Sequence, residues 1–264
     1  MYKGYKLDLD DLETEDYVDL PNYINIGKSI HKDHKAQVRQ KLDSFKSSNG
    51  NLVASEIIAG WFPPIRADVF LSHSHKDEDA VFWLSGFLYL KFGLTSFIDS
   101  SIWGYSDDLL KLLDDAYCYK EITNTYSYSM RNRSTSHVHI MLSIALMKMI
   151  DSCECIMFVD TPHSISPKKY INSGDETDSP WIYSEISMTS LVRRKTPFKH
   201  RSLFAKSARA MDSMVESLQI QYDLDLNHLI PLTGTQFAEW EQCGEKGAKA
   251  LDALYELENE KHEY

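Results

Sequence analysis

Short apolar runs alternate with helix-like patterns in the middle of the chain. Residues 67–74, ADVFLSHS, and 94–99, LTSFID, are apolar runs, and residues 77–93, DEDAVFWLSGFLYLKFG, lie between them with acids at the start and Gly93 at the end. Acidic side chains favour the first turn of a helix, and glycine favours the position after its last turn. The pattern predicts a strand–helix–strand unit, typical of a parallel sheet covered by helices.

A second step of the same kind follows. Residues 137–151, HVHIMLSIALMKMID, are apolar nearly all round and lead directly into the run 153–161, CECIMFVDT. We therefore expect a buried helix and then a buried strand. Ser179 and Pro180 have the residue types of an N-cap and a first helical position, which predicts a helix over residues 181–192.

The C-terminal part contains one more apolar run, HLIPLT, residues 228–233. It is preceded by a predicted helix that reaches about residue 218 and followed by a charged amphipathic pattern over residues 236–262. We expect a final strand and a final helix.

Two segments are expected to add to this α/β unit. Residues 1–25 are acidic and Tyr-rich with little periodicity, which predicts an arm or an irregular edge, and residues 28–48 and 52–60 read as two helices. Ser106 is placed to cap an inserted helix, residues 106–117, after the second strand. A polar loop rich in Tyr, Ser and Asn is expected to follow that helix.

Composition and charge limit the classes of partner. The formal net charge of −11 opposes non-specific binding to nucleic acid or to anionic lipid. No apolar run reaches the roughly 18 residues of a membrane span, and the acidic N-terminus is unlike a signal peptide. We expect a cytoplasmic protein that binds no membrane, and its four cysteines have the spacing of reduced thiols rather than of a disulfide framework.

The segment His73-Ser74-His75-Lys76-Asp77 has two interpretations. It is most of the HxHxDH signature of two-metal hydrolases, but Glu78 stands where the last histidine is required. In the alternative, Ser72, His73 and Ser74 end the first strand, where open α/β sheets place their ligands, and Asp77 begins the next helix. We favour the second interpretation and expect no metal site.

A carboxylate beside an aromatic side chain is expected further along the chain. Trp181 and Glu185 are four residues apart, so they share one face of the predicted helix. The spacing WxxxE is common by chance, and a Trp packed on the sheet with a solvated Glu would produce it too.

Taken together, the segments DVFLSHSHKDED, LTSFIDSSIWGYSDD, CECIMFVDTP and SPWIYSEI resemble the successive conserved boxes of the TIR (Toll/interleukin-1 receptor) domain, in its bacterial enzymatic branch. The resemblance covers roughly residues 67–192. It implies a flavodoxin-like open parallel sheet in a TIR-like domain over residues 67–264. Residues 1–66 have no counterpart in a minimal TIR domain, and we expect a helical N-terminal extension there whose residues 1–60 act as a sensor or brake. It also implies cleavage of NAD+ at the nicotinamide–ribose bond, with NAD+ as substrate and no separate cofactor.

The resemblance also implies roles for individual residues. Glu185 corresponds to the essential glutamate, and Trp181 would shape the pocket wall. The loop after the second strand would border NAD+ and help self-association, through Asp99, Trp103 and Tyr105. Ser72, His73 and Ser74 could contact the ribose or pyrophosphate, or Ser74 could cap the helix while His73 packs. Arg131 and Arg133 could pair with the pyrophosphate or be solvated loop charges.

The implied chemistry is consistent with one carboxylate. Nicotinamide leaves as a neutral molecule, so no general acid is needed, unlike in an ordinary glycosidase. Glu185 would stabilise the oxocarbenium-like transition state or attack the anomeric carbon.

Two other classes of function stay open. One is a non-catalytic TIR assembly module, and the other is a nucleoside deoxyribosyltransferase-like enzyme, which uses similar chemistry on nucleosides. By analogy with the bacterial branch we expect a role in antiviral defence, with a second copy of the chain or another defence protein as partner.

Overall fold

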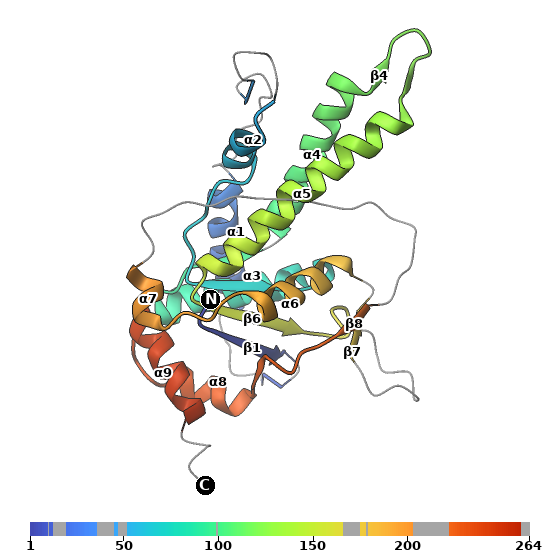
Figure 1. The fold of residues 1–264 in the computed structure, drawn as a ribbon. Coiled ribbons are helices and arrows are strands. Elements are labelled where there is room, and N and C mark those ends of the chain that lie inside the picture. Colours follow the sequence, from blue (N-terminus) through green and yellow to red (C-terminus); the bar gives the residue numbers. More distant parts are fainter. Residues whose placement is uncertain are drawn as a thin grey trace.

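A five-stranded sheet with all neighbours parallel forms the centre of the protein (Figure 1). Its strands are β1 (Lys3–Asp8), β2 (Val69–Ser72), β3 (Ser96–Ile98), β6 (Cys155–Asp160) and β9 (Ile230–Leu232), in the order β3-β2-β6-β1-β9. This computed structural model describes residues 1–9, 11–12, 20–35, 45–46, 52–98, 100–165, 175–177, 179–202 and 222–259.

Helices and two small antiparallel pairs complete the described chain. The helices are α1 (Leu20–Lys35), α2 (Ala54–Trp61), the 3-10 turn η3 (His75–Asp77), α3 (Glu78–Phe92), α4 (Ser100–Tyr117), α5 (Tyr128–Ser152), α6 (Pro180–Leu191), α7 (Pro197–Ser202), α8 (Gly234–Glu241) and α9 (Ala248–Asn259). The pairs join β4 (Tyr119–Lys120) to β5 (Thr125–Tyr126) and β7 (Asp175–Thr177) to β8 (Tyr222–Leu224). No helix in these ranges combines the length and the apolar character that crossing a membrane requires.

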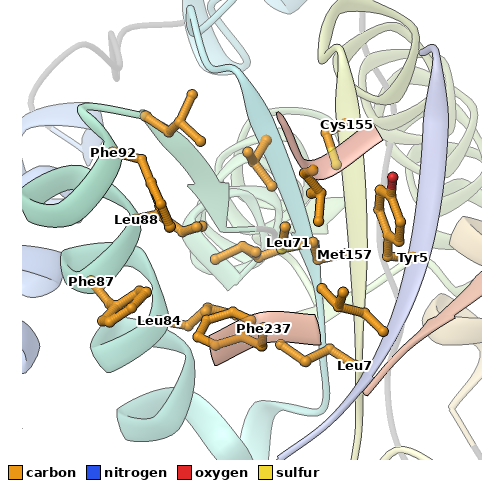
Figure 2. Close-up of a cluster of buried hydrophobic side chains, with 14 of the residues drawn as sticks. Tyr5, Leu7, Leu71, Leu84, Phe87, Leu88, Phe92, Cys155, Met157 and Phe237 are labelled. Carbon is orange, nitrogen blue, oxygen red and sulfur yellow. The ribbon is translucent and has the colours of Figure 1, made fainter. Parts of the chain in front are cut away.

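Hydrophobic cores lie on both faces of the sheet because neighbouring residues of a strand point to opposite sides. Phe70 and Ile156 belong to a cluster that also contains residues of α2, α4 and α5. Leu71 and Met157 belong to a second cluster, with residues of α3, α8 and α9 (Figure 2). The result is a three-layer arrangement of helices, sheet and helices.

Helix α1 packs on the outside of α3 at a very close crossing. A β-carbon placed on Gly86 of α3 would lie 1.9 Å from the carbonyl oxygen of Tyr23, and one placed on Gly27 of α1 would lie 2.0 Å from that of Phe82. Both positions therefore require glycine, because any larger residue would push the two backbones apart.

The expected α/β class with a parallel sheet is confirmed. The predicted apolar runs contain β2, β3, β6 and β9. Gly93 ends α3 in the left-handed conformation, at φ 65°, and Ser179 caps α6 with Pro180 in its first turn, as predicted. All four cysteines are free.

The arm or irregular edge expected over residues 1–25 is wrong for Lys3–Asp8. These residues form β1, which pairs with β6 on one side and with β9 on the other. The boundary between residues 66 and 67 consequently does not separate an extension from the sheet. Deleting residues 1–60 would remove an internal strand, so such a deletion would not test the expected sensor or brake role separately from folding.

The strand order is compatible with a flavodoxin-like fold, except that the strand in the fourth position comes from a different part of the chain. In the common 2-1-3-4-5 order the fourth position follows the third along the chain. Here β3, β2 and β6 occupy the first three positions, whereas the fourth is filled by β1 from the N-terminal side. The TIR fold itself is therefore an expectation that this order does not establish.

Helices α4 and α5 form a projecting hairpin, here called the arm (residues 100–152), with β4 and β5 at its tip (Figure 1). Ser106 does not cap the helix as expected, because α4 begins at Ser100. The polar loop predicted after α4 is instead the β4–β5 turn and the first turns of α5. The burial expected all round α5 is wrong on its outer side, where Ile140 is 67 % exposed.

The predicted helix over residues 236–262 is interrupted. Gly244 and Gly247 have φ values of 69° and 54° and separate α8 from α9. The basic stretch before the helix expected up to residue 218 contains α7, and residues 203–218 of that helix lie outside the described residues. Of the helix expected over residues 28–48, residues 28–35 belong to α1 and residues 36–44 lie outside the described residues, whereas Lys46 forms a β-bridge with Leu52.

Candidate functional site

A buried carboxylate lies over the carboxyl end of β2. The hydroxyl of Ser72 donates a hydrogen bond of 2.6 Å to Oε2 of Glu185. Both residues are 0 % exposed. Because a buried carboxylate is costly without hydrogen-bond donors, this contact fixes α6 against the end of β2.

The faces of α6 explain how Glu185 reaches the sheet. Ile182 and Ile186 pack with Phe158 of β6 in a small cluster of their own. Trp181 and Met188 belong instead to the cluster shared with α2, α4 and α5. Glu185 lies one helical turn from Trp181 and one from Met188. Trp181 and Glu185 therefore lie on one face of α6, as expected.

The ring of Trp181 lies against the arm. It stacks on His139 of α5, with ring centroids 6.4 Å apart and an interplanar angle of 10°. Trp181 is partly buried by this contact and by the cluster around it. The residue expected as a pocket wall thus also connects α6 to α5.

His73 and Ser74 differ in their surroundings. His73 is 2 % exposed, with its ring 6.3 Å from that of His75. Ser74 is half-buried, and its hydroxyl accepts from the backbone N–H of Lys76 at 3.4 Å, so it caps the η3 turn. Ser74 thus caps the η3 turn and His73 is buried, and contact of these residues with a ligand stays a prediction.

Asp77 connects the exits of β2 and β6. Thr161 Oγ1 donates to its Oδ2 at 2.6 Å, and Nδ1 of His163 lies 2.7 Å from its Oδ1. The side chain of Asp77 is 11 % exposed, whereas that of His163 is 49 % exposed. Asp77 was expected to act on the helix dipole alone, and this cross-connection was missed.

The contact between Asp77 and Thr161 could have been predicted from the sequence. Thr161 follows β6 directly, and the carboxyl ends of parallel strands meet at one edge of a sheet. Next to them, Lys6 of β1 forms an ion pair of 2.8 Å with Asp160 at the end of β6. Polar residues from three strands therefore gather at the edge that also carries Ser72.

The proposed metal signature does not assemble into a metal site in the described part of the chain. No group of three or more His, Cys, Asp or Glu side chains is arranged there to hold an ion. Asp77 is engaged by Thr161 and His163 rather than turned toward His73 and His75.

The residues expected in the loop after the second strand have a different setting. Asp99 lies outside the described residues. Trp103 and Tyr105 are part of the backbone of α4 rather than of a loop, and their side chains are not among those that the structure describes. Their expected contact with NAD+ stays a prediction.

Two buried thiols are excluded as nucleophiles. Burial raises the pKa of Cys153 to about 12 and raises the pKa of Cys155 well above its ordinary value. A thiol is nucleophilic as thiolate, so neither is reactive near neutral pH. Both thiols lie at the amino end of β6, away from the edge that carries Ser72 and Glu185.

Comparisons of the chain with protein-family models, with curated proteins and with solved structures give no match.

Proposed function

We propose that this protein is a TIR-type NAD+ glycohydrolase or ADP-ribosyl cyclase in which Glu185 is the catalytic residue. The observation that carries the proposal is the hydrogen bond from Ser72 to Glu185, which places a carboxylate over the carboxyl end of a parallel strand. Open α/β sheets bind their ligands at this edge. The resemblance of four sequence segments to the TIR domain supplies the substrate.

The reaction needs little from the protein besides charge. The bond between the ribose C1′ and the nicotinamide nitrogen breaks, and its electron pair leaves with neutral nicotinamide. Glu185 stabilises the resulting cationic centre or bonds to it. Attack by water gives ADP-ribose and a proton, whereas attack by another part of the same molecule gives a cyclic product.

Burial of Glu185 has a consequence for regulation. At 0 % exposure its carboxylate does not meet the solvent. NAD+ therefore reaches it only after the contact between α6 and the sheet opens, and the basal rate is low. A closed resting state fits a defence role in which NAD+ is depleted after a trigger, the role that the resemblance suggests.

The decisive experiment is an assay of NAD+ loss with product identification by mass spectrometry. The wild type at high concentration should release nicotinamide, and Glu185→Gln, which keeps the size but removes the charge, should lower the rate about 100-fold or more. Glu239→Gln, on the exposed side of α8, is the matched control and should keep the full rate. Equal rates in the two variants would refute the role of Glu185.

Nucleosides are the second set of substrates in the same assay. If the wild type exchanges the base of a deoxynucleoside but leaves NAD+ intact, the deoxyribosyltransferase-like alternative replaces the proposal. If Glu185→Gln loses that exchange, Glu185 would still be the catalytic residue.

The arm favours an assembly role as a second candidate. It exposes Ile122 fully, Tyr128 to 81 % and Ile140 to 67 %. Exposed apolar surface of this kind marks interaction sites. Light scattering should show self-association that is weakened by replacing Ile122 and Tyr128 with Ser, and a monomer at high concentration with NAD+ present would rule self-association out.

A further inference from the structure

The arm and α2 line a cavity that is half open to solvent, away from the Glu185 site. Its volume is about 520 Å³, within the range of small-molecule sites, about 300–1,000 Å³. Helix α2, the C-terminal half of α4 and the first half of α5 supply its walls. Of the residues discussed for NAD+, Arg133 lines this cavity, whereas Ser72, His73, Ser74, Trp181 and Glu185 do not.

Most of the cavity lining is apolar. Ile57 of α2, Leu113 of α4 and Met141 of α5 line it and are each less than one-tenth exposed. Ala54 and Tyr117 extend the apolar lining toward the more exposed parts of α2 and α4. Such a lining favours a hydrocarbon or aromatic body.

The charged and imidazole groups of the lining come from one helix. Arg133 and His137 lie four residues apart on α5 and therefore on one face. No ion pair or hydrogen bond of either side chain is recorded among the described residues. A guanidinium keeps its charge at any physiological pH, so this side of the cavity is positive.

Two acidic side chains of the same arm have other partners. Asp114 is 5 % exposed and accepts from Arg131 Nε at 2.8 Å and from the hydroxyl of Ser134. Asp115 accepts from the hydroxyl of Tyr126 at 2.5 Å. Arg131 is thus neutralised within the arm, whereas Arg133, two residues further on, is available for an anion from outside.

We propose that this cavity binds a free amphipathic carboxylate of the medium-chain fatty acid type. Its apolar chain lies among the residues of α2, α4 and α5, and its carboxylate pairs with Arg133 next to His137. Guanidinium and carboxylate match in shape and charge, which makes Arg133 the residue that selects an acid over a neutral molecule of the same length.

Isothermal titration of the full chain with dodecanoate, below its micelle concentration, tests the proposal. The wild type should bind one molecule saturably, and Arg133→Gln should weaken binding about 10- to 100-fold. Lys111→Gln removes a charge from the exposed side of the same arm and should bind like the wild type. Dodecanol should bind the wild type and Arg133→Gln equally, which shows that the cavity of the variant is intact.

A second variant, Ala54→Trp, fills the cavity and should abolish binding of both compounds while leaving the thermal melting profile unchanged. Absence of saturable dodecanoate binding by the wild type would overturn the proposal. Equal affinities of Arg133→Gln and Lys111→Gln would overturn it too. Binding that survives Ala54→Trp would place the acid on the exposed face of α5 instead, which contradicts the cavity assignment.

Discussion

The layers around the sheet and the projecting arm use the same kinds of residue in opposite ways. Around the sheet, large apolar side chains are enclosed and polar ones are paired inside, as in the 2.6 Å contact between the hydroxyls of Ser85 and Ser96. On α5 of the arm, Leu142 is 1 % exposed but Ile140 is 67 % exposed. Apolar side chains around the sheet thus stabilise the fold, whereas on the outer side of the arm they form exposed apolar surface.

The largest expected effect tests this difference within one helix. Leu142→Ala should lower the free energy of unfolding by about 2–5 kcal/mol, because it leaves a cavity in the core. Ile140→Ala should change it by less than about 0.5 kcal/mol, because the side chain is mostly in solvent. Urea denaturation measures both, and similar losses would mean that the outer face of α5 is covered in solution.

A smaller effect is expected where α1 meets α3. Gly86→Ala should cost about 1–3 kcal/mol, because its β-carbon would meet the backbone of Tyr23 and force α1 away. Leu90→Ala, at a 40 % exposed position of α3, is the control and should be nearly neutral. Thermal melting compares them; a neutral Gly86→Ala would show that the two helices do not cross this closely.

The smallest expected effect depends on pH. His228 Nε2 lies 2.7 Å from the hydroxyl of Thr189 on α6, and burial lowers the pKa of His228 below 6.5. The neutral form is favoured in the folded state, so its contribution is fully present above pH about 6.5 and is lost as the pH falls toward the lowered value.

Urea denaturation at pH 7.5 and pH 5.5 measures this linkage. The wild type should lose more stability on acidification than His228→Gln, which cannot take up the proton. An equal loss in both proteins would assign the pH dependence to other groups.

The sequence predicted the elements whose apolar runs are long and continuous. Residues 67–99 give β2, α3 and β3 because strand and helix periods are clear there and Gly93 ends the helix. Strand β1 was missed because Tyr5 and Leu7 are the only large apolar residues of KGYKLD, and the charge of Lys6 is offset by Asp160, far along the chain. The projecting start of α5 was missed because a helix away from the core needs no apolar stripe.

The sequence predicted which residues of the candidate site lie on which element, but it did not predict the contacts between those residues. Ser179 and Pro180 fixed the start of α6, so the face that carries Glu185 followed. The contact between Ser72 and Glu185 joins residues 113 positions apart, which no local pattern encodes. The partners of Asp77 likewise depend on how β2 and β6 pair, which appears only when the sheet is assembled.

The position of β1 has a consequence for how the protein is made. A ribosome produces β1 before either of the strands that flank it, since Lys3 pairs with Cys155 and Tyr5 with Ile230. The segment therefore stays without these partners until the chain has been synthesised as far as β6. Closing contacts between such distant positions is slow, so the pairing of β1 with β6 and β9 is expected to limit the rate of folding.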